Sequence, residues 1–414
     1  MSMGEQRVPK QITIDQIAVP ADIKPVNRRK ILEYLMSGEK CTAADICAAT
    51  GISKPTTMRA LQYFCKEGLL ESAGLGQSSK VGGKRPEYFV FSDMRKILCI
   101  ALWPKSITLA LSNLVGDVYA LEEYPHIAED NLDDVFFSLK TLVFPYLARQ
   151  GVLPSDLYGV GISVSGTVDY RENLLYYNAH APGWGRNIHI EDYLRPIFGD
   201  TPQYILENAG RVCGRAILLD QPELAQQRVL SLFCTWGLSA CLIGNGHVLS
   251  GKDALIGEIG HMIINTTTSI PCACGKNGCL ERSTQLEHII SLLGADHPLC
   301  KGDEPLTFCR LFEASAAGDM AARQVVADLA HCFAVALHNL ALIYNPDVVI
   351  FQGDFSLADK HFDDCLKREL AEFRYFPEAG IFEVHYDKRD LAWLATRGSA
   401  AMLQEHYFAS LQFD

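Results

Sequence analysis

The sequence predicts an α/β protein in which an N-terminal winged helix-turn-helix precedes a larger domain. The first 91 residues contain three short helical segments, then two strand-like segments around a glycine-rich loop. Beyond them, β-branched stretches such as LYGVGISV and PDVVIFQG alternate with helical segments such as AARQVVADLAHCFAVALHNLALIY, as buried strands and their covering helices do. At 414 residues the chain is too long for one compact core, so we expect several lobes.

The composition is that of a soluble globular protein, with 48% hydrophobic and 21% charged residues, which excludes a disordered or fibrous chain. No apolar run is expected to cross a bilayer, because even CFAVALHNLALIY is interrupted by His338 and Asn339. The N-terminus MSMGEQRVPK lacks a signal-peptide core, so we expect a cytoplasmic protein with no membrane insertion. The 14 cysteines lie mostly in apolar segments and fit reduced thiols better than a disulfide framework.

The charge of the chain is distributed unevenly. The formal net charge is -12, yet residues 1–91 contain 13 lysines and arginines against 9 acidic residues. Residues 92–414 therefore carry 24 basic against 40 acidic side chains. Only the N-terminal part has the charge balance expected of a nucleic-acid-binding domain.

The first predicted helix starts at Pro25. The apolar residues of KPVNRRKILEYLMSGE recur at helical spacing, and the pattern ends at Ser37-Gly38. Residues 1–23 carry little signal and are expected to form an N-terminal arm. Residues 24–91 are predicted to form the winged helix-turn-helix.

Two further helices and a tight turn follow. Thr42 can cap a short helix, Gly51 can supply the turn, and Ser53 can cap a third helix that has Pro55 in its first turn. This order of helix, tight turn and helix is that of a helix-turn-helix.

The third helix has two faces with different chemistry. Four residues fall on one side and should be buried: Thr57, Ala60, Leu61 and Phe64. A neighbouring stripe of Thr56, Arg59 and Tyr63 faces outward and can enter a major groove. Together with Ser53 and Lys54 at the start of the helix, this stripe forms the candidate DNA-reading surface.

A wing is predicted after the third helix. A strand begins at Gly68-Leu69-Leu70, and SSKVGGKRPEYFVF reads as a glycine-tipped loop with a returning strand. The loop carries Lys84 and Arg85, and Arg85 can approach an A·T-rich minor groove. The alternative is that this small domain docks a protein instead of DNA.

One cluster of residues has the spacing of a metal site. His261, Cys272, Cys274 and Cys279 form the pattern H-x10-C-x-C-x4-C, which supplies the four donors of a closed tetrahedral zinc site. Gly275 and Gly278 allow the chain to fold around the ion. Because protein ligands fill all four positions, the zinc should be structural. The alternative is four buried residues without a metal.

Two glutamates flank this cluster. Glu258 lies three residues before His261, and Glu281 lies two residues after Cys279. Anchored ligands would also anchor both carboxylates, and a fixed pair of carboxylates suits a ligand rich in hydroxyl groups. The alternative is that both acids form surface salt bridges.

At these residues the chain strongly resembles the ROK family of repressors, open reading frames and sugar kinases. The family's E-x-G-H motif occurs as Glu258-Ile-Gly-His261, and its C-x-C-G-x-x-G-C-x-E motif occurs as Cys272 to Glu281. Further matches lie in GVGISVSGTVD, NAHAPGW, ILEN and NPDVVIFQG. The resemblance extends from about Lys24 to the C-terminus, since the family's repressors of glucose, xylose and N-acetylglucosamine genes have a similar winged helix.

The resemblance implies two actin-like (RNase H-like) lobes around a cleft. The first lobe would comprise residues 92–205 with 390–414, and the second, residues 206–389, would carry the zinc site. The family places sugar near Asn208, Glu258, His261 and Glu281, with the loops of Gly166 and Gly183 closing the pocket.

The sequence departs from the sugar kinases of the family at three places. The expected general base, an aspartate after Glu-Asn, is Ala209, and a methyl group cannot accept a proton. The expected D-x-G-x-T turn is replaced by ILCIALWPKSITLAL, with Ala101, Trp103 and Lys105 in that region. The glycine-rich phosphate loop has become TWGLSAC, where Trp236 would obstruct a nucleotide. We therefore expect no catalytic residue and no ATP.

These observations predict a transcriptional regulator of carbohydrate uptake or catabolism that acts as a repressor. Its partners would be operator DNA and a sugar or phosphosugar effector. Arg211 and Arg215 are suited to a phosphorylated or acidic sugar, although arginines at such positions are more often solvated or salt-bridged. We expect a homodimer or homotetramer, because one winged helix neutralises few phosphates. The alternatives are an ATP-dependent sugar kinase with an added DNA-binding domain, and a regulator controlled by a sugar-transport protein.

Overall fold

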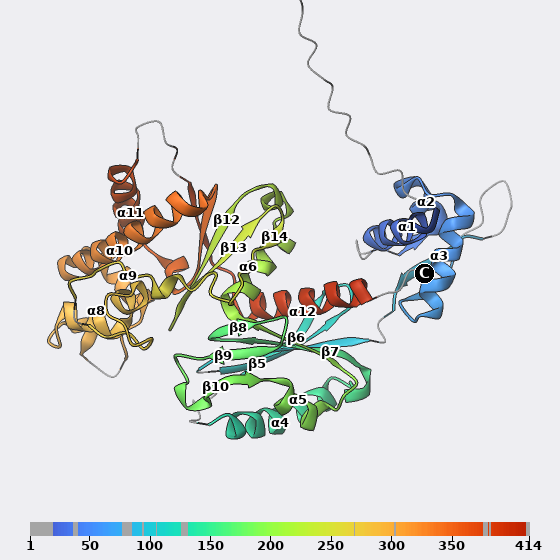
Figure 1. Ribbon diagram of the computed structural model, residues 1–414, viewed down its shortest axis with the longest axis horizontal. Helices are drawn as coiled ribbons and strands as arrows, with labels where there is room; N and C mark the ends of the chain where they lie inside the picture. Colours follow the sequence, from blue (N-terminus) through green and yellow to red (C-terminus); the bar gives the residue numbers. More distant parts are fainter. Residues whose placement is uncertain are drawn as a thin grey trace, which may run out of the picture. The chain divides into compact units, whose positions relative to one another are not determined.

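The computed structural model divides the chain into two compact units (Figure 1). The first comprises Met1–Met94 with Tyr407–Asp414, and the second comprises Arg95–His406. The structure describes residues 20–35, 40–76, 85–92, 95–104, 106–125, 131–268, 270–301, 304–375, 380 and 382–410.

The first unit contains three helices and a small antiparallel sheet. Its elements are α1 (Pro20–Leu35), β1 (Cys41–Thr42), α2 (Ala43–Thr50), α3 (Lys54–Lys66), β2 (Leu70–Leu75) and β3 (Glu87–Phe91), with strand order β1-β3-β2. This is the predicted winged helix-turn-helix. The predicted start of the first helix was wrong, because α1 begins at Pro20 and holds Pro25 inside it. The predicted arm therefore overlaps α1, and residues 1–19 lie outside the described part.

The predicted turn and the predicted Thr42 cap of the first unit have a clear geometric basis, whereas Ser53 stands at the N-cap of α3 without a side-chain hydrogen bond to the helix backbone. Thr42 and Asp45 form a capping box at the start of α2, which satisfies backbone N–H groups that have no partner within the helix. Gly51 ends α2 with φ 71°, a conformation that costs glycine little. The predicted inner face of α3 is buried throughout: Thr57, Ala60, Leu61 and Phe64.

The end of the last helix belongs to the first unit. Helix α12 spans Leu391–Ser410, and its residues from Tyr407 onward group with the winged helix-turn-helix. Tyr407 is buried, and the rings of Phe91 and Phe408 meet edge to face with centroids 6.2 Å apart. The assignment of all of residues 390–414 to the first lobe is corrected here, because these aromatic side chains pack against β3.

The second unit consists of two lobes, each built on a five-stranded sheet (Figure 1). The first sheet has the order β11-β7-β4-β5-β6, with β4 (Lys96–Leu102), β5 (Ser106–Asn113), β6 (Val118–Pro125), β7 (Leu157–Val164) and β11 (Gln203–Asn208). Helices α4 (Leu132–Arg149) and α5 (Glu191–Phe198) pack on one face of it. Helix α12 lies on the other face, with Leu403 against Gly159 of β7.

The second sheet has the order β14-β13-β12-β15-β16, with β12 (Val229–Cys234), β13 (Leu238–Gly244), β14 (His247–Val248), β15 (Val348–Gly353) and β16 (Glu383–Asp387). One face packs against α8 (Leu286–Leu293), α9 (Phe308–Ala316), α10 (Met320–Tyr344) and α11 (Lys360–Glu372). Helix α6 (Ala209–Asp220) packs against the opposite face. The predicted lobe boundary at 205/206 falls inside β11, which pairs with β7 through Asn208, so the boundary moves to the end of that strand.

Helix α10 is long and apolar enough, by length and composition, to cross a membrane, which the sequence did not lead us to expect. It is the central helix of the second lobe, and side chains such as Phe333 and Leu337 are buried in the core of that lobe. Its apolar character is therefore accounted for by packing against β15 and α11.

Candidate functional site

A cavity of about 620 Å³ opens between the two lobes of the second unit. The first lobe contributes the turn after β7 and the small sheet of β8 (Thr167–Asp169), β9 (Leu174–Tyr177) and β10 (Arg186–His189). The second lobe contributes β13, the segment around Glu258 and the start of α7 (Leu280–Thr284). The volume of the cavity lies within the range of small-molecule sites.

The structure brings five of the six predicted sugar-binding residues to this cavity, namely Gly166, Asn208, Glu258, His261 and Glu281. Asn208 caps α6 by accepting from the Gly210 N–H at 2.9 Å, and its amide donates to the Gly166 carbonyl at 2.8 Å. Asn208 therefore fixes the Gly166 turn against the start of α6. Gly166 has φ 119°, and a Cβ there would lie 2.6 Å from the Tyr177 carbonyl oxygen.

Gly183 is the exception among the predicted sugar-binding residues. It is exposed and lies outside the cavity lining, whereas Ala179 and His180 from the preceding part of the same loop line it. The expectation that Gly183 closes the pocket is corrected accordingly. Gly183 is the middle residue of the 3-10 turn Pro182–Trp184.

The two carboxylates are inside the cavity, so the surface salt-bridge alternative does not describe them. Glu281 is 4% exposed, and its Oε2 accepts from the Leu238 N–H at 2.9 Å. Its Oε1 is buried without a hydrogen-bond partner in the protein. Burial, together with the nearby Glu281 carboxylate, raises the pKa of Glu258 to about 7, because an ionised carboxyl is disfavoured both by desolvation and by a like charge.

His180 is a cavity residue that the sequence analysis did not identify. Its Nε2 lies 3.9 Å from Glu281 Oε2, and burial lowers the pKa of the imidazole against the opposing attraction of Glu281. A Cβ on Gly237 would lie 2.7 Å from this Nε2, so the retained glycine makes room for the ring. His180 lies in the segment NAHAPGW, which matches the family, but the spacing of residues in that segment does not indicate that the side chain points into the cavity.

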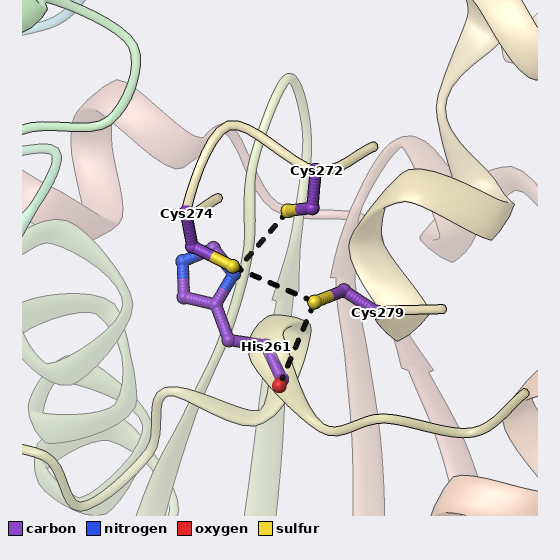
Figure 2. A group of neighbouring side chains, drawn as sticks. All are labelled: His261, Cys272, Cys274 and Cys279. Atoms are coloured by element: carbon purple, nitrogen blue, oxygen red, sulfur yellow. Dashed lines mark hydrogen bonds between the residues drawn. The ribbon is translucent and has the colours of Figure 1, made fainter. Parts of the chain in front are cut away.

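The four predicted metal ligands converge on one point. Figure 2 shows the side chains of His261, Cys272, Cys274 and Cys279 turned toward one another, and their ligand atoms all lie within 4.8 Å of each other. The Sγ atoms of Cys274 and Cys279 are 3.6 Å apart, and Cys272 Sγ is 3.7 Å from His261 Nδ1. A tetrahedral zinc ion with Zn–S bonds of about 2.3 Å requires ligand atoms roughly 3.8 Å apart. The spacing and the soft donors therefore fit zinc.

The two glycines of the metal loop act in different ways. Gly275 has φ 85° with open space where a Cβ would stand, so it is needed for its backbone conformation alone. Gly278 has φ 76°, and a Cβ there would collide with the carbonyl oxygen of Asn265. The crowding at Gly278 thus comes from the neighbouring chain segment.

The metal cluster is physically connected to the carboxylates. His261 ends the 3-10 turn Ile259–His261, and the Leu280 N–H donates to the Met262 carbonyl at 2.9 Å, which ties this turn to the start of α7. A Cβ on Gly260 would lie 3.1 Å from Glu281 Oε2. An ion held at the cluster would therefore fix the backbone that follows Glu258 and the backbone that precedes Glu281.

The residues that depart from the kinase pattern meet at one wall of the cavity. Ala209, Phe233 and Trp236 line it, and the rings of Trp103 and Trp236 are in contact with centroids 5.4 Å apart. Phe233 packs against both indoles, at 6.1 and 6.3 Å. Trp236 donates its Nε1–H to Ser165 Oγ at 3.2 Å. Ala101 is buried in the same apolar cluster as Trp103, and Lys105 lies outside the described residues.

Arg211 and Arg215 are not among the residues that line the cavity, and the salt-bridged alternative describes them, not the role with an acidic sugar. Arg211 is buried and forms an ion pair with Glu207 at 3.3 Å, while Arg215 pairs with Glu405 at 2.6 Å. Burial raises the pKa of Glu207 to about 7, against the attraction of Arg211. Both arginines are therefore structural ion-pair partners of glutamates.

The predicted DNA-reading residues have unequal access to solvent. Ser53, Lys54, Arg59 and Arg85 are exposed, and Thr56 is partly exposed with its hydroxyl 2.9 Å from that of Ser53. The guanidinium of Arg28 lies 3.7 Å above the ring centroid of Tyr63, so one face of that ring is already covered. Lys84 and the tip of the wing lie outside the described residues.

Comparison with known proteins gives two matching families for the two parts of the chain. The ROK family matches residues 98–401, and the MarR family matches residues 25–76. A xylose repressor of Caldicellulosiruptor bescii is 26% identical over 372 residues, covering 86% of this chain and 89% of the repressor. A glucokinase of Halalkalibacterium halodurans is 25% identical over 266 residues, covering 61% of this chain and 78% of the enzyme.

Among solved structures, a ROK family transcriptional regulator described as a homologue of the Escherichia coli MLC protein aligns with a TM-score of 0.72 at 18% identity. The alignment covers 93% of this chain and 97% of the other. These matches confirm the predicted fold class, an N-terminal winged helix followed by a two-lobed actin-like domain of the sugar-kinase type.

Proposed function

The chain belongs to the ROK family, and we propose that it is a cytoplasmic transcriptional regulator that represses genes of carbohydrate uptake or catabolism. The winged helix-turn-helix would bind operator DNA, and the two-lobed domain would bind a sugar or phosphosugar effector. The similarity to a xylose repressor over most of both chains supports this assignment.

The observation that carries the non-catalytic part of the proposal is the aromatic wall of the cavity. Phosphoryl transfer needs a base for the attacking hydroxyl and backbone N–H groups that approach the phosphates. Ala209 stands at the base position, and Trp103, Phe233 and Trp236 fill the region where the family's phosphate-binding segments meet. Because indole and phenyl rings neither accept a proton nor coordinate phosphate, the cavity is suited to bind a ligand without transforming it.

The donor set of the metal cluster supports a structural zinc ion. His261, Cys272, Cys274 and Cys279 would hold it, and their four atoms leave no coordination position for water. Its contribution would be to fix the chain on both sides of the carboxylate pair, as outer-shell groups fix ligands in other metal sites.

The DNA-binding part would work as a symmetric oligomer. A homodimer or homotetramer presents two copies of α3 to successive turns of the operator and doubles the number of neutralised phosphates. Effector binding would favour an arrangement in which the two α3 helices no longer match their half-sites. Thr56 and Arg59 would contact bases and Lys54 the phosphate backbone, whereas Tyr63 would support α1 through its contact with Arg28.

A second candidate function, an ATP-dependent sugar kinase, is favoured by one observation, the similarity to a glucokinase. A coupled assay of ADP release with the zinc-loaded protein, Mg²⁺-ATP and a hexose panel tests it directly. Turnover above that of a protein-free control would overturn the non-catalytic proposal.

The effector proposal is tested by calorimetric titration of the zinc-loaded protein with pentoses, hexoses, N-acetylhexosamines and their phosphates. The variant Glu281→Gln removes the buried carboxylate, and Glu372→Gln, at an exposed position near the end of α11, is its matched control. We expect at least one sugar to bind, with affinity lost in Glu281→Gln and retained in Glu372→Gln. If no sugar binds either protein, control by a protein partner such as a sugar-transport component replaces the effector proposal.

A further inference from the structure

His180 and Glu281 bring polar groups from different lobes to one point of the cavity. His180 lies in the loop after β9 of the first lobe, and Glu281 lies in α7 of the second lobe. The atoms His180 Nε2 and Glu281 Oε2 are 3.9 Å apart, which is longer than a hydrogen bond. The two groups are therefore close enough to share a third partner without bonding to each other.

The backbone of the loop holds His180 in this position. The His180 N–H donates to Asn178 Oδ1 at 3.0 Å, and the Ala181 N–H donates to the Asn178 carbonyl at 3.2 Å. Asn178 is itself buried. The imidazole still reaches the cavity, since 21% of the His180 side chain is exposed. A side chain on a backbone fixed in this way has less freedom to lose when a ligand binds.

Gly237 leaves a space open beside both polar atoms. It lines the cavity, and a Cβ at this position would lie 2.7 Å from His180 Nε2 and 3.5 Å from Glu281 Oε2. The space that the absent side chain leaves is therefore within reach of both groups. A hydroxyl oxygen there could accept from Nε2 at about 2.9 Å and donate to Oε2 at about 2.8 Å. The separation of 3.9 Å between the two atoms is shorter than the sum of these lengths, so both bonds can form together.

We propose that His180 is an effector-binding residue, and that one sugar hydroxyl accepts a hydrogen bond from its Nε2 and donates one to Glu281 Oε2. The inference rests on the proposed function, because it concerns the ligand of the same cavity, and it names the contact by which that ligand joins the two lobes. Imidazole Nε2 donates in the charged ring and in one neutral tautomer, whereas an ionised carboxylate only accepts. A hydroxyl satisfies both groups, while an ether oxygen or a deoxy carbon leaves Glu281 without a donor.

The competing account is a direct ion pair of His180 with Glu281 that holds the lobes together and contacts no ligand. Calorimetric titration of the full-length zinc-loaded protein with D-glucose, D-xylose and N-acetyl-D-glucosamine, extended to the rest of the sugar panel, separates the two accounts. For the sugar that binds, His180→Ala should weaken binding about 5- to 50-fold, because one ligand group then loses its buried partner.

Two further variants accompany His180→Ala. In His180→Gln the side-chain amide can donate from a similar position, so binding should stay within about threefold of the wild type. His247→Ala changes a histidine that is exposed on β14 and outside the cavity lining, and it should bind the sugar as the wild type does. If His180→Ala lowers Tm and leaves the affinity for the sugar unchanged, the competing account holds and the inference is overturned.

The complete set of monodeoxy analogues of the bound sugar shows whether His180 and one hydroxyl act as a pair. His180→Ala should weaken the parent sugar and all analogues but one. For that analogue its affinity, measured by displacement where binding is weak, should stay within about twofold of the wild type, because the hydroxyl that the imidazole contacts is already absent. A loss that is equal for the parent and every analogue overturns the inference.

Gly237→Ala tests the position of this hydroxyl without removing either polar group. Its methyl group would occupy the space beside His180 Nε2 and Glu281 Oε2, so it should weaken the parent sugar more than the same analogue. Equal weakening of both would overturn the placement beside Gly237. If no sugar binds the wild type, the proposed function fails together with this inference. If binding depends on Glu281 and is indifferent to His180→Ala, the effector proposal stands and this inference alone fails.

Discussion

The substitution Gly278→Ala should disable the metal loop, and Gly275→Ala should leave it nearly intact. Both glycines have positive φ, at 76° and 85°, and a side chain in that conformation costs about 1–2 kcal/mol. The Cβ of Gly275→Ala would meet open space, whereas that of Gly278→Ala would collide with the Asn265 carbonyl. Forcing an added methyl into packed backbone costs a further 1–3 kcal/mol, roughly. Gly278→Ala should therefore lose about 2–5 kcal/mol and Gly275→Ala about 1–2.

Two measurements on each variant check this difference. Metal released after thiol modification should report one zinc per chain in the wild type and in Gly275→Ala, and well under one in Gly278→Ala. Thermal unfolding with excess zinc should show the larger loss of Tm for Gly278→Ala, because displacing its loop also moves Cys279. Equal zinc content and equal Tm in the two variants would refute the argument from the Asn265 contact.

Three further predictions concern the cavity and the DNA-binding surface. Because burial raises the pKa of Glu258 to about 7 from 4.5, the folded chain holds a proton that the unfolded chain releases, so stability should fall as pH rises between these values. In urea unfolding at pH 5 and pH 8, Glu258→Gln should lose less stability than the wild type, and parallel losses would contradict the assignment. Arg59→Ala should weaken binding to DNA selected from a random pool and relax preference at one base pair, measured by fluorescence anisotropy and reselection. Lys54→Ala should weaken all sequences alike and reduce the salt dependence of binding by about one ion; a base-specific effect of Lys54→Ala would reverse these roles.

The local features of the first unit were predictable because each depends on neighbouring residues. The capping box of Thr42 and the left-handed turn at Gly51 need only the sequence around them. The start of α1 was not predictable in the same way. Proline is common in the first turn of a helix, so Pro25 suggested a helix start, whereas it lies inside a helix that begins at Pro20. The contact that covers one face of the Tyr63 ring was not predicted, because Arg28 belongs to another helix.

The cavity was predictable in part for a similar reason. Cysteine and histidine spacing indicates the metal cluster without knowledge of the fold, because the ligands of a closed site are concentrated in one loop. The lobes themselves were expected only through resemblance to a family. The position of His180 beside Glu281 and the burial of the Arg211 and Glu207 pair depend on how distant segments of the chain pack. Local sequence patterns do not predict such packing.

The proposed loss of kinase chemistry is the clearest case in which sequence and structure combine. Trp103 and Trp236 stand far apart in the chain, and each by itself was a departure from a family motif. Their ring contact shows that the departures form one apolar wall beside Ala209. This wall is the observation on which the proposed absence of phosphoryl transfer rests.

The central claim is that a carbohydrate bound in the cavity, and left unchanged there, releases the protein from DNA. The most direct measurement is fluorescence anisotropy of labelled operator DNA, obtained by selection, during titration with each sugar that binds in calorimetry. The account predicts release by the bound sugar without ATP, no further effect of Mg²⁺-ATP, and no release from Glu281→Gln. Operator affinity that is unchanged by every bound sugar, or release that requires ATP, would contradict it.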